Sequence, residues 1–173
     1  MSKGDAEVAL VQLRRRVDDH FGAAVARTPD AFACREGCAR CCGVRFGVFA
    51  VEADRIRGAL ARLDATLRER VRVQADDPSH TACALLVDDR CSVYDERPLI
   101  CRSHGLPVQH RDDDGHAHVE VCPLNFVDAT PPPASVLVLD ALNAPLGVLA
   151  RMWDGAGERI ELAELARAQK ASP

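Results

Sequence analysis

The chain has 173 residues, a formal net charge of −4, eight cysteines, one tryptophan and one tyrosine. This length is enough for one domain with its own hydrophobic core, so the cysteines are not needed as disulfide staples. The negative charge gives no long-range attraction to nucleic acid or anionic lipid, and the few aromatic side chains offer no platform for stacking bases. The densest basic run, Arg14–Arg16, falls in an amphipathic pattern and is interpreted as a solvated helix face.

The N-terminus and the hydropathy of the chain indicate its compartment. Residues 1–7 carry acids where a signal peptide needs an apolar stretch, and no apolar run approaches the length of about 18 residues that a membrane span needs. We therefore expect a cytoplasmic protein with no membrane segment. Cytosolic thiols are kept reduced, so the clustered cysteines are expected to be metal ligands or redox-active groups.

The first predicted element is a helix from about Asp5 to Arg27. Apolar residues recur there with the spacing of one buried helical stripe, at Leu10, Leu13, Val17, Phe21 and Ala24. Pro29 ends the helix because it disfavours helical geometry in the residue before it and lacks an N–H. The cysteine-rich stretch Cys34–Gly43 follows, and its glycines predict a loop that points several thiols inward.

A short strand is predicted over Val44–Phe49, and a longer helical region begins at about Val51. Apolar residues fall on one face of that region, at Ile56, Leu60, Leu63, Leu67 and Val71. Asp64 is suited to cap a second segment, so one long helix and two shorter helices both fit the pattern.

The segment between residues 83 and 101 has apolar runs too short for a long helix, and it is predicted to be irregular structure tied down by its thiols. Near its end, Asp95 is suited to cap a helix that has Pro98 in its first turn. This arrangement places Cys101 in a short helix.

A two-stranded hairpin is predicted around the acidic turn 112–115, with strands over 108–110 and 118–121. The second strand leads toward the cluster through Cys122. The acids of the turn lack the spacing of an EF-hand loop. The histidines in or beside the turn are interpreted as solvated: His110, His116 and His118.

The C-terminal part is predicted to be helical. Pro131–Pro133 forms a stiff connector, and an apolar stripe then predicts a helix over 136–153, which Pro145 is expected to kink or divide. An amphipathic pattern predicts a last helix over Glu158–Lys170. These helices, at about 135–170, and the N-terminal helix at 5–27 are expected to pack on the cysteine-bearing region.

Four of the cysteines fall within nine residues, Cys34–Cys42. The pair Cys38-x2-Cys41 has the spacing of a zinc knuckle, which Cys34 and Cys42 overfill. Adjacent residues in extended chain point to opposite faces, so Cys41 and Cys42 either share one centre or divide between two. Soft thiolates suit zinc and iron–sulfur clusters alike, so both metals stay open. We predict metal ligation by all eight cysteines: Cys34, Cys38, Cys41, Cys42, Cys83, Cys91, Cys101 and Cys122.

Further motifs follow the cluster in a fixed order, namely Val51-Glu52-Ala53, Cys83-Ala84-Leu85-Leu86, the run from Cys91 through Tyr94 and Arg97-Pro98 to Cys101-Arg102, and Cys122-Pro123-Leu124-Asn125-Phe126. Over about residues 32–126 this set resembles the CxxCxxCC family of cysteine-cluster proteins. The resemblance implies a domain that chelates zinc or iron and no settled activity. A related cluster occurs in a flagellin lysine methylase. One departure is the spacing of three residues between Cys34 and Cys38, where the family name implies two.

Basic and polar residues within these motifs are candidates to surround the metal ligands. Positive charge and hydrogen-bond donors beside thiolates offset the negative charge that cysteinates build around a divalent ion. Tyr94, Arg97 and Arg102 are the candidates for this role. For Arg97, a surface ion pair with the acid at 95 or 96 is an equal alternative.

His104 is the leading non-cysteine ligand candidate, because it lies three residues after Cys101. An exposed histidine, or one satisfied by other hydrogen bonds, fits the same position.

We predict a mainly α-helical single domain, residues 1–173, with a small β-hairpin and a helical shell around a loop-rich cysteine metal site. The metal is expected to contribute to folding, because the span 34–122 lacks long apolar stripes outside the helical region around Ile56. The predicted function is binding of zinc or iron, with the metal ion as the only identifiable partner. An iron–sulfur or mononuclear-iron enzyme and a thiol redox switch are the alternatives. No motif marks out catalytic residues.

Overall fold

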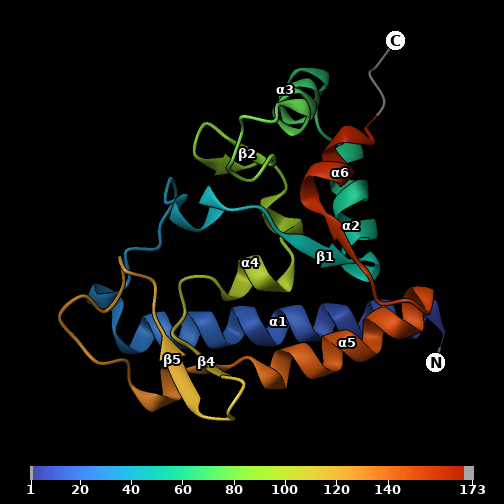
Figure 1. The fold of residues 1–173 in the computed structure, drawn as a ribbon. Coiled ribbons are helices and arrows are strands. Elements are labelled where there is room, and N and C mark those ends of the chain that lie inside the picture. Colours follow the sequence, from blue (N-terminus) through green and yellow to red (C-terminus); the bar gives the residue numbers. More distant parts are fainter. Residues whose placement is uncertain (1, 170–173) are drawn as a thin grey trace. The chain divides into compact units, whose positions relative to one another are not determined.

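Figure 1 shows the computed structural model, which describes residues 2–169. The protein is mainly α-helical with short strands in sheets of two or three, as predicted. The chain divides into two compact units, each made of two separate stretches of sequence. The first unit comprises residues 1–35 and 99–149, and the second comprises residues 36–98 and 150–173. The single domain stays a prediction.

The longest element of the first unit is α1, Lys3–Arg27. Ser2 caps it, because the Ser2 hydroxyl accepts the N–H of Asp5 at 3.2 Å while the Asp5 carboxylate accepts the N–H of Ser2 at 2.7 Å. The helix ends before Pro29, as predicted, and its apolar stripe packs against α4, Leu99–Ser103. Within residues 2–169, neither α1 nor any other helix is long and apolar enough to cross a membrane.

The first unit also contains a three-stranded sheet in the order β5-β4-β6. The predicted hairpin is confirmed as β4, Val108–Arg111, paired antiparallel with β5, Ala117–Glu120. The third strand, β6, is Leu137–Val138 and lies parallel to β4. The helix predicted from residue 136 therefore begins later, as α5, Asp140–Asp154. Pro145 lies in the second turn of α5 and does not divide it.

Two consecutive helices organise the second unit, α2 at Ala50–Ala61 and α3 at Ala65–Asp76. The side chain of Asp64 accepts the N–H of Leu67 at 2.9 Å and so caps α3. This cap selects two helices over one long helix. A short C-terminal helix, α6 at Leu162–Arg167, packs against both.

Strands complete the second unit. The predicted strand near Phe49 is confirmed as β1, Gly47–Phe49, and pairs antiparallel with β7, Arg159–Glu161. This pairing shortens the last predicted helix, whose end at Lys170 lies outside the described residues. The core that these elements enclose is apolar, with fully buried side chains at Val48, Ile56, Leu60 and Val71.

Candidate metal centre

The eight predicted ligands divide between the two units. Five cysteines lie in the second unit, at Cys38, Cys41, Cys42, Cys83 and Cys91, and the other three lie in the first unit, at Cys34, Cys101 and Cys122. All eight are within the described residues, and all are thiols rather than disulfides.

A backbone contact joins the two cysteine-bearing segments of the second unit. Cys41 and Cys42 lie in a 3-10 helix, Arg40–Gly43, where a loop was predicted. The N–H of Cys83 donates to the carbonyl of Cys42 at 2.8 Å. This bond brings together thiols that are about 40 residues apart in the sequence.

A two-strand hairpin returns the chain from Cys83 to Cys91. Its strands are β2, Leu86–Val87, and β3, Arg90–Cys91, and they pair antiparallel with Leu86 opposite Cys91. Asp88 and Asp89 form the turn with φ of 52° and 58°, the left-handed geometry of a tight hairpin. This hairpin lies where irregular structure was predicted.

Side chains of α3 hold this hairpin in place. The Arg70 guanidinium donates two hydrogen bonds to the Asp88 carboxylate, at 2.8 and 2.7 Å. The Gln74 amide donates to the carbonyls of Ala84 and Leu86 at 3.1 and 2.9 Å. The hairpin therefore has a fixed position on the helical core of the second unit.

Four thiols of the second unit influence one another's ionisation. A hydrogen bond with the Cys42 thiol, then burial and the charge of Cys42, hold the pKa of Cys41 far above its ordinary value. Burial, with smaller effects from Cys91 and Cys41, raises the pKa of Cys83 to about 11. Burial also raises the pKa of Cys91, and Cys41 adds to this effect. The four side chains are neighbours that oppose one another's negative charge.

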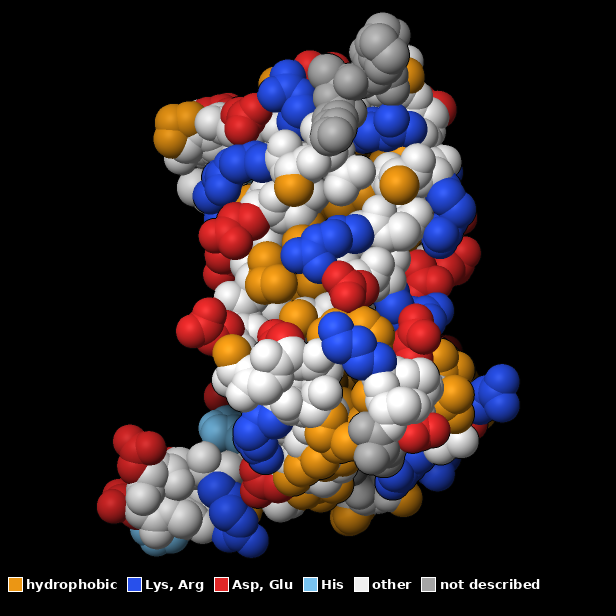
Figure 2. Space-filling view, turned by 90° about the vertical axis from the view of Figure 1, so that its right-hand side faces the viewer, with side chains coloured by type: hydrophobic (Ala, Val, Ile, Leu, Met, Phe, Trp, Pro, Cys, Tyr) orange, Lys and Arg blue, Asp and Glu red, His pale blue; other side chains and the backbone are white. Residues whose placement is uncertain are grey.

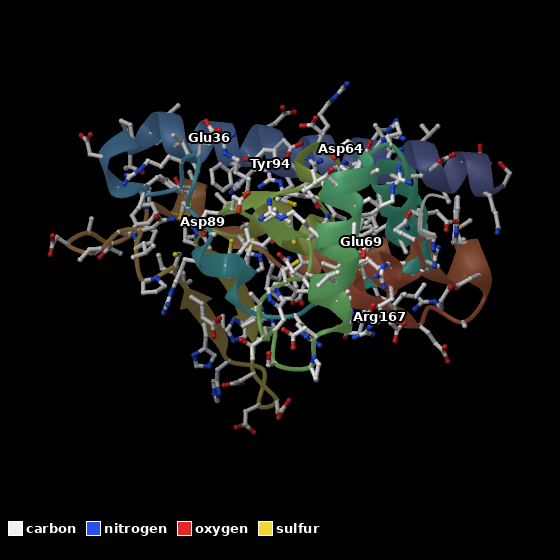
Figure 3. The ribbon with its side chains drawn as sticks, turned by 90° about the horizontal axis from the view of Figure 1, so that it is seen from above. Glu36, Asp64, Glu69, Asp89, Tyr94 and Arg167 are labelled. Carbon is white, nitrogen blue, oxygen red and sulfur yellow. The ribbon has the colours of Figure 1, made fainter. Side chains whose placement is uncertain are left out.

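Arg97 lies beside this group of thiols. Its guanidinium carbon is 3.6 Å from the centroid of the Tyr94 ring, and its Nε donates to the Tyr94 carbonyl at 3.0 Å. A hydrogen bond with Cys42 and burial raise the pKa of Cys41, and burial raises the pKa of Cys91; the positive charge of Arg97 acts in the opposite direction on both thiols. Figure 3 draws the side chains with sulfur in yellow and labels Tyr94.

One of the two acids weighed as a surface partner of Arg97 is bound by another arginine. Glu96 accepts two hydrogen bonds from Arg55 of α2, at 2.9 and 3.0 Å. The role of Arg97 as a group that offsets thiolate charge stays a prediction.

The donor types of the second unit suit a soft metal ion, although the described side chains are not arranged around a common point. Cys41, Cys42, Cys83 and Cys91 supply four sulfur donors, Cys83 is buried, and a guanidinium stands nearby. The raised pKa values of Cys41, Cys83 and Cys91 mean that a cation is needed to hold these three as thiolates. Among the described residues, no group of three or more His, Cys, Asp or Glu side chains has the geometry to hold a metal ion.

In the first unit, Cys34 lies against two residues near the sequence motifs. The Asn125 amide donates to the Cys34 sulfur at 3.3 Å and to the carbonyl of Gly105 at 2.7 Å, and its oxygen accepts the N–H of Ala33 at 2.8 Å. Gly105 has φ of 97°, and a Cβ there would lie 2.5 Å from the Cys34 sulfur. Only glycine fits this position.

Aromatic side chains fix the segment that precedes Cys34. Phe32 packs against Phe21 of α1 and against Phe126, with ring centroids 5.7 and 5.0 Å apart. The N–H of Phe126 donates to the carbonyl of Ala31 at 2.8 Å. The Cys34 segment is thus attached to the motif that contains Cys122.

The other predicted residues of the first unit are placed as follows. Arg102 lies within α4 and forms an ion pair with Asp18 of α1 at 2.6 Å. Burial lowers the pKa of His104, which favours the neutral imidazole that a metal ligand requires. The metal-related roles of Arg102 and His104 stay predictions, as does ligation by Cys38, Cys101 and Cys122.

Asn125 and Gly105 were not among the predicted site residues. A signal was present in the sequence, since Asn125 follows Cys122 by three residues and Gly105 follows His104 directly. What sequence alone does not give is the burial of the amide and the positive φ of the glycine.

Comparison with known proteins gives one match. A family model described as "putative zinc- or iron-chelating domain" matches residues 33–123, just over half of the chain and all eight cysteines. No curated protein and no solved structure matches. By this match over the cysteine motifs, the chain belongs to the CxxCxxCC family.

Proposed function

We propose that this protein is a cysteine-thiolate metal-binding protein whose main centre uses Cys41, Cys42, Cys83 and Cys91 to bind zinc or iron. The observation that carries the proposal is the backbone hydrogen bond from Cys83 to Cys42, which joins the two cysteine-bearing segments of the second unit; the effects of the thiols on one another's pKa values support it. Membership of a zinc- or iron-chelating family supports it. The remaining cysteines are proposed as further ligands, and three of them share the first unit.

The chain's own residues would act on a bound ion in distinct ways. The four thiols would bind it, and Arg97 would offset their charge. A tetrahedral ion with four protein ligands keeps no position for a substrate, which supports a structural, storage or sensing role over catalysis. Thiols with raised pKa values are poor nucleophiles at neutral pH, which argues against a metal-free redox switch. Reduced thiols suit the cytoplasm, the compartment that we propose.

Metal analysis of protein purified without oxygen tests the proposal. Zinc, iron and acid-labile sulfide should be measured together with the visible spectrum. A colourless protein with stoichiometric zinc supports a zinc centre, and a brown protein with stoichiometric sulfide supports an iron–sulfur cluster. A metal-free protein with oxidised cysteines contradicts the proposal.

Double variants test whether Cys41 and Cys42 share one centre. Cys41→Ala and Cys42→Ala should each remove the same equivalent of metal, and the double variant should remove no more than either single variant. The same holds for Cys83→Ala combined with Cys91→Ala. Ser92→Ala, next to Cys91, is the matched control and should keep the metal. Loss of two equivalents in the double variant would show that the neighbours serve two centres.

A further inference from the structure

Titratable side chains gather on the β4–β5 hairpin, outside the cysteine motifs. In its register His110 lies opposite His118, and the N–H of Asp112 donates to the carbonyl of His116 at 3.0 Å. Alternate residues of paired strands share a face, so one face carries every histidine of the hairpin and two carboxylates: His110, Asp112, His116, His118 and Glu120. Figure 2 shows pale-blue histidine side chains on the molecular surface.

The two facing imidazoles have a separation that suits one shared ion. The ring centroids of His110 and His118 are 5.8 Å apart, with 32° between the ring planes. Metal–nitrogen bonds of about 2.0–2.1 Å place the centres of two rings on one ion about 4.5–5.5 Å apart, for ligand angles of about 90–120°. The strands therefore hold the pair close to that separation, and a small rotation of the side chains is enough to reach it without a change of backbone.

Each of these histidines also has a carboxylate partner. The Nε2 of His118 is 2.6 Å from Asp112, and the Nε2 of His110 is 3.7 Å from Glu120. The hydrogen bond with His118 contributes most to a pKa of Asp112 below its usual range, so this carboxylate stays ionised. A metal-binding histidine commonly donates its other ring N–H to a carboxylate, which orients the ring and makes it a better ligand.

We propose that His110 and His118 bind one divalent transition-metal ion, with water completing its coordination. Imidazole with nearby carboxylate suits Zn²⁺, Ni²⁺ or Cu²⁺. His110 and His118 keep 34% and 53% of their side-chain surface exposed, so the ion exchanges readily with solvent. This site is independent of the thiolate centre and stands whether or not that centre binds metal.

Ni²⁺ is the probe, added to tag-free protein whose cysteines have first been supplied with zinc. Because Ni²⁺ is paramagnetic, NMR identifies the residues beside it through the broadening of their signals. The ring signals of His110 and His118 should broaden together and saturably, ahead of those of His20 and His80. His110→Gln and His118→Gln should each weaken the binding at least tenfold.

His116→Gln is the matched control, since it removes an exposed imidazole from the same turn, and it should change the affinity less than twofold. Backbone amide shifts of β4 and β5 check that each variant keeps the hairpin. The proposal is overturned if the two rings of the unaltered protein do not broaden together, or if His116→Gln weakens binding as much as the other two substitutions.

Discussion

Asn125 is 3% exposed, and its side chain contacts three groups of the first unit. It accepts from the N–H of Ala33, donates to the carbonyl of Gly105 and donates to the sulfur of Cys34. A buried amide whose oxygen and nitrogen both form hydrogen bonds fixes the segments that it joins. At the scale of single residues, Asn125 therefore positions Cys34.

Asn125→Ala should lower the free energy of unfolding by about 2–3 kcal/mol, because two backbone groups lose their partner in a buried place. Urea denaturation followed by circular dichroism measures this change. The matched control is Asn143→Ala, which alters the other asparagine of the chain at an exposed position of α5 and should change stability by less than about 0.5 kcal/mol. Equal effects of the two substitutions would contradict the positioning role.

Metal binding by the thiols of the second unit should release protons. Cys41, Cys83 and Cys91 have raised pKa values, about 11 for Cys83, so they are protonated at pH 7 and must lose their protons to bind an ion. The apparent affinity should therefore rise with pH up to these pKa values. Calorimetry in buffers of different ionisation enthalpy should give about four protons per zinc ion at pH 7. A release below two protons would show that fewer thiols bind.

At the scale of secondary structure, prediction succeeded where one local signal decided the element. The apolar stripe gave α1, Pro29 gave its end, and the acidic turn before Gly115 gave the β4–β5 hairpin. Prediction failed where pairing between distant segments decided it. β6 forms because β4 offers it an open edge, and β7 forms because β1 offers it one. Neither of these two pairings is visible in the local sequence pattern of β6 or β7.

The same distinction between local signals and long-range contacts applies to the cysteine site. The candidate ligands are predicted from the sequence, but the grouping of the thiols is not, because it depends on the backbone bond between Cys42 and Cys83 and on the turn at Asp88 and Asp89. The turn itself was recognisable, since two residues that tolerate left-handed geometry lie between short apolar runs. The bond between residues 42 and 83 was not.

Asp64 decides how the helical region of the second unit is divided, and this can be measured. Asp64→Ala removes the acceptor of the Leu67 N–H and should cost about 1 kcal/mol of stability. Asp64→Asn keeps an acceptor at the same place and should cost much less. Denaturant unfolding compares the two variants. If they destabilise equally, the cap does not contribute, and the break between α2 and α3 must come from packing.

At the scale of the whole molecule, the two units are stabilised by different secondary-structure elements. The first unit contains the 25-residue helix α1 and a three-stranded sheet. The second unit has a core of three shorter helices, and much of its chain between residues 36 and 98 is loop and two-residue strands. Loop-rich segments open most easily, so the second unit should depend more on a bound ion.

Removing the metal should therefore loosen the two units unequally. After chelation, amide hydrogen exchange should lose protection first around Leu86 and Cys91 in β2 and β3, while the amides of α1 stay protected. Cys83→Ala should show the same pattern without a chelator, which separates loss of the ion from side effects of the reagent. Adding zinc back should restore protection in the unaltered protein and not in the variant. Equal loss in α1 and in the hairpin would instead mean that the metal supports both units, and unchanged exchange would mean that the thiolate centre contributes nothing to folding.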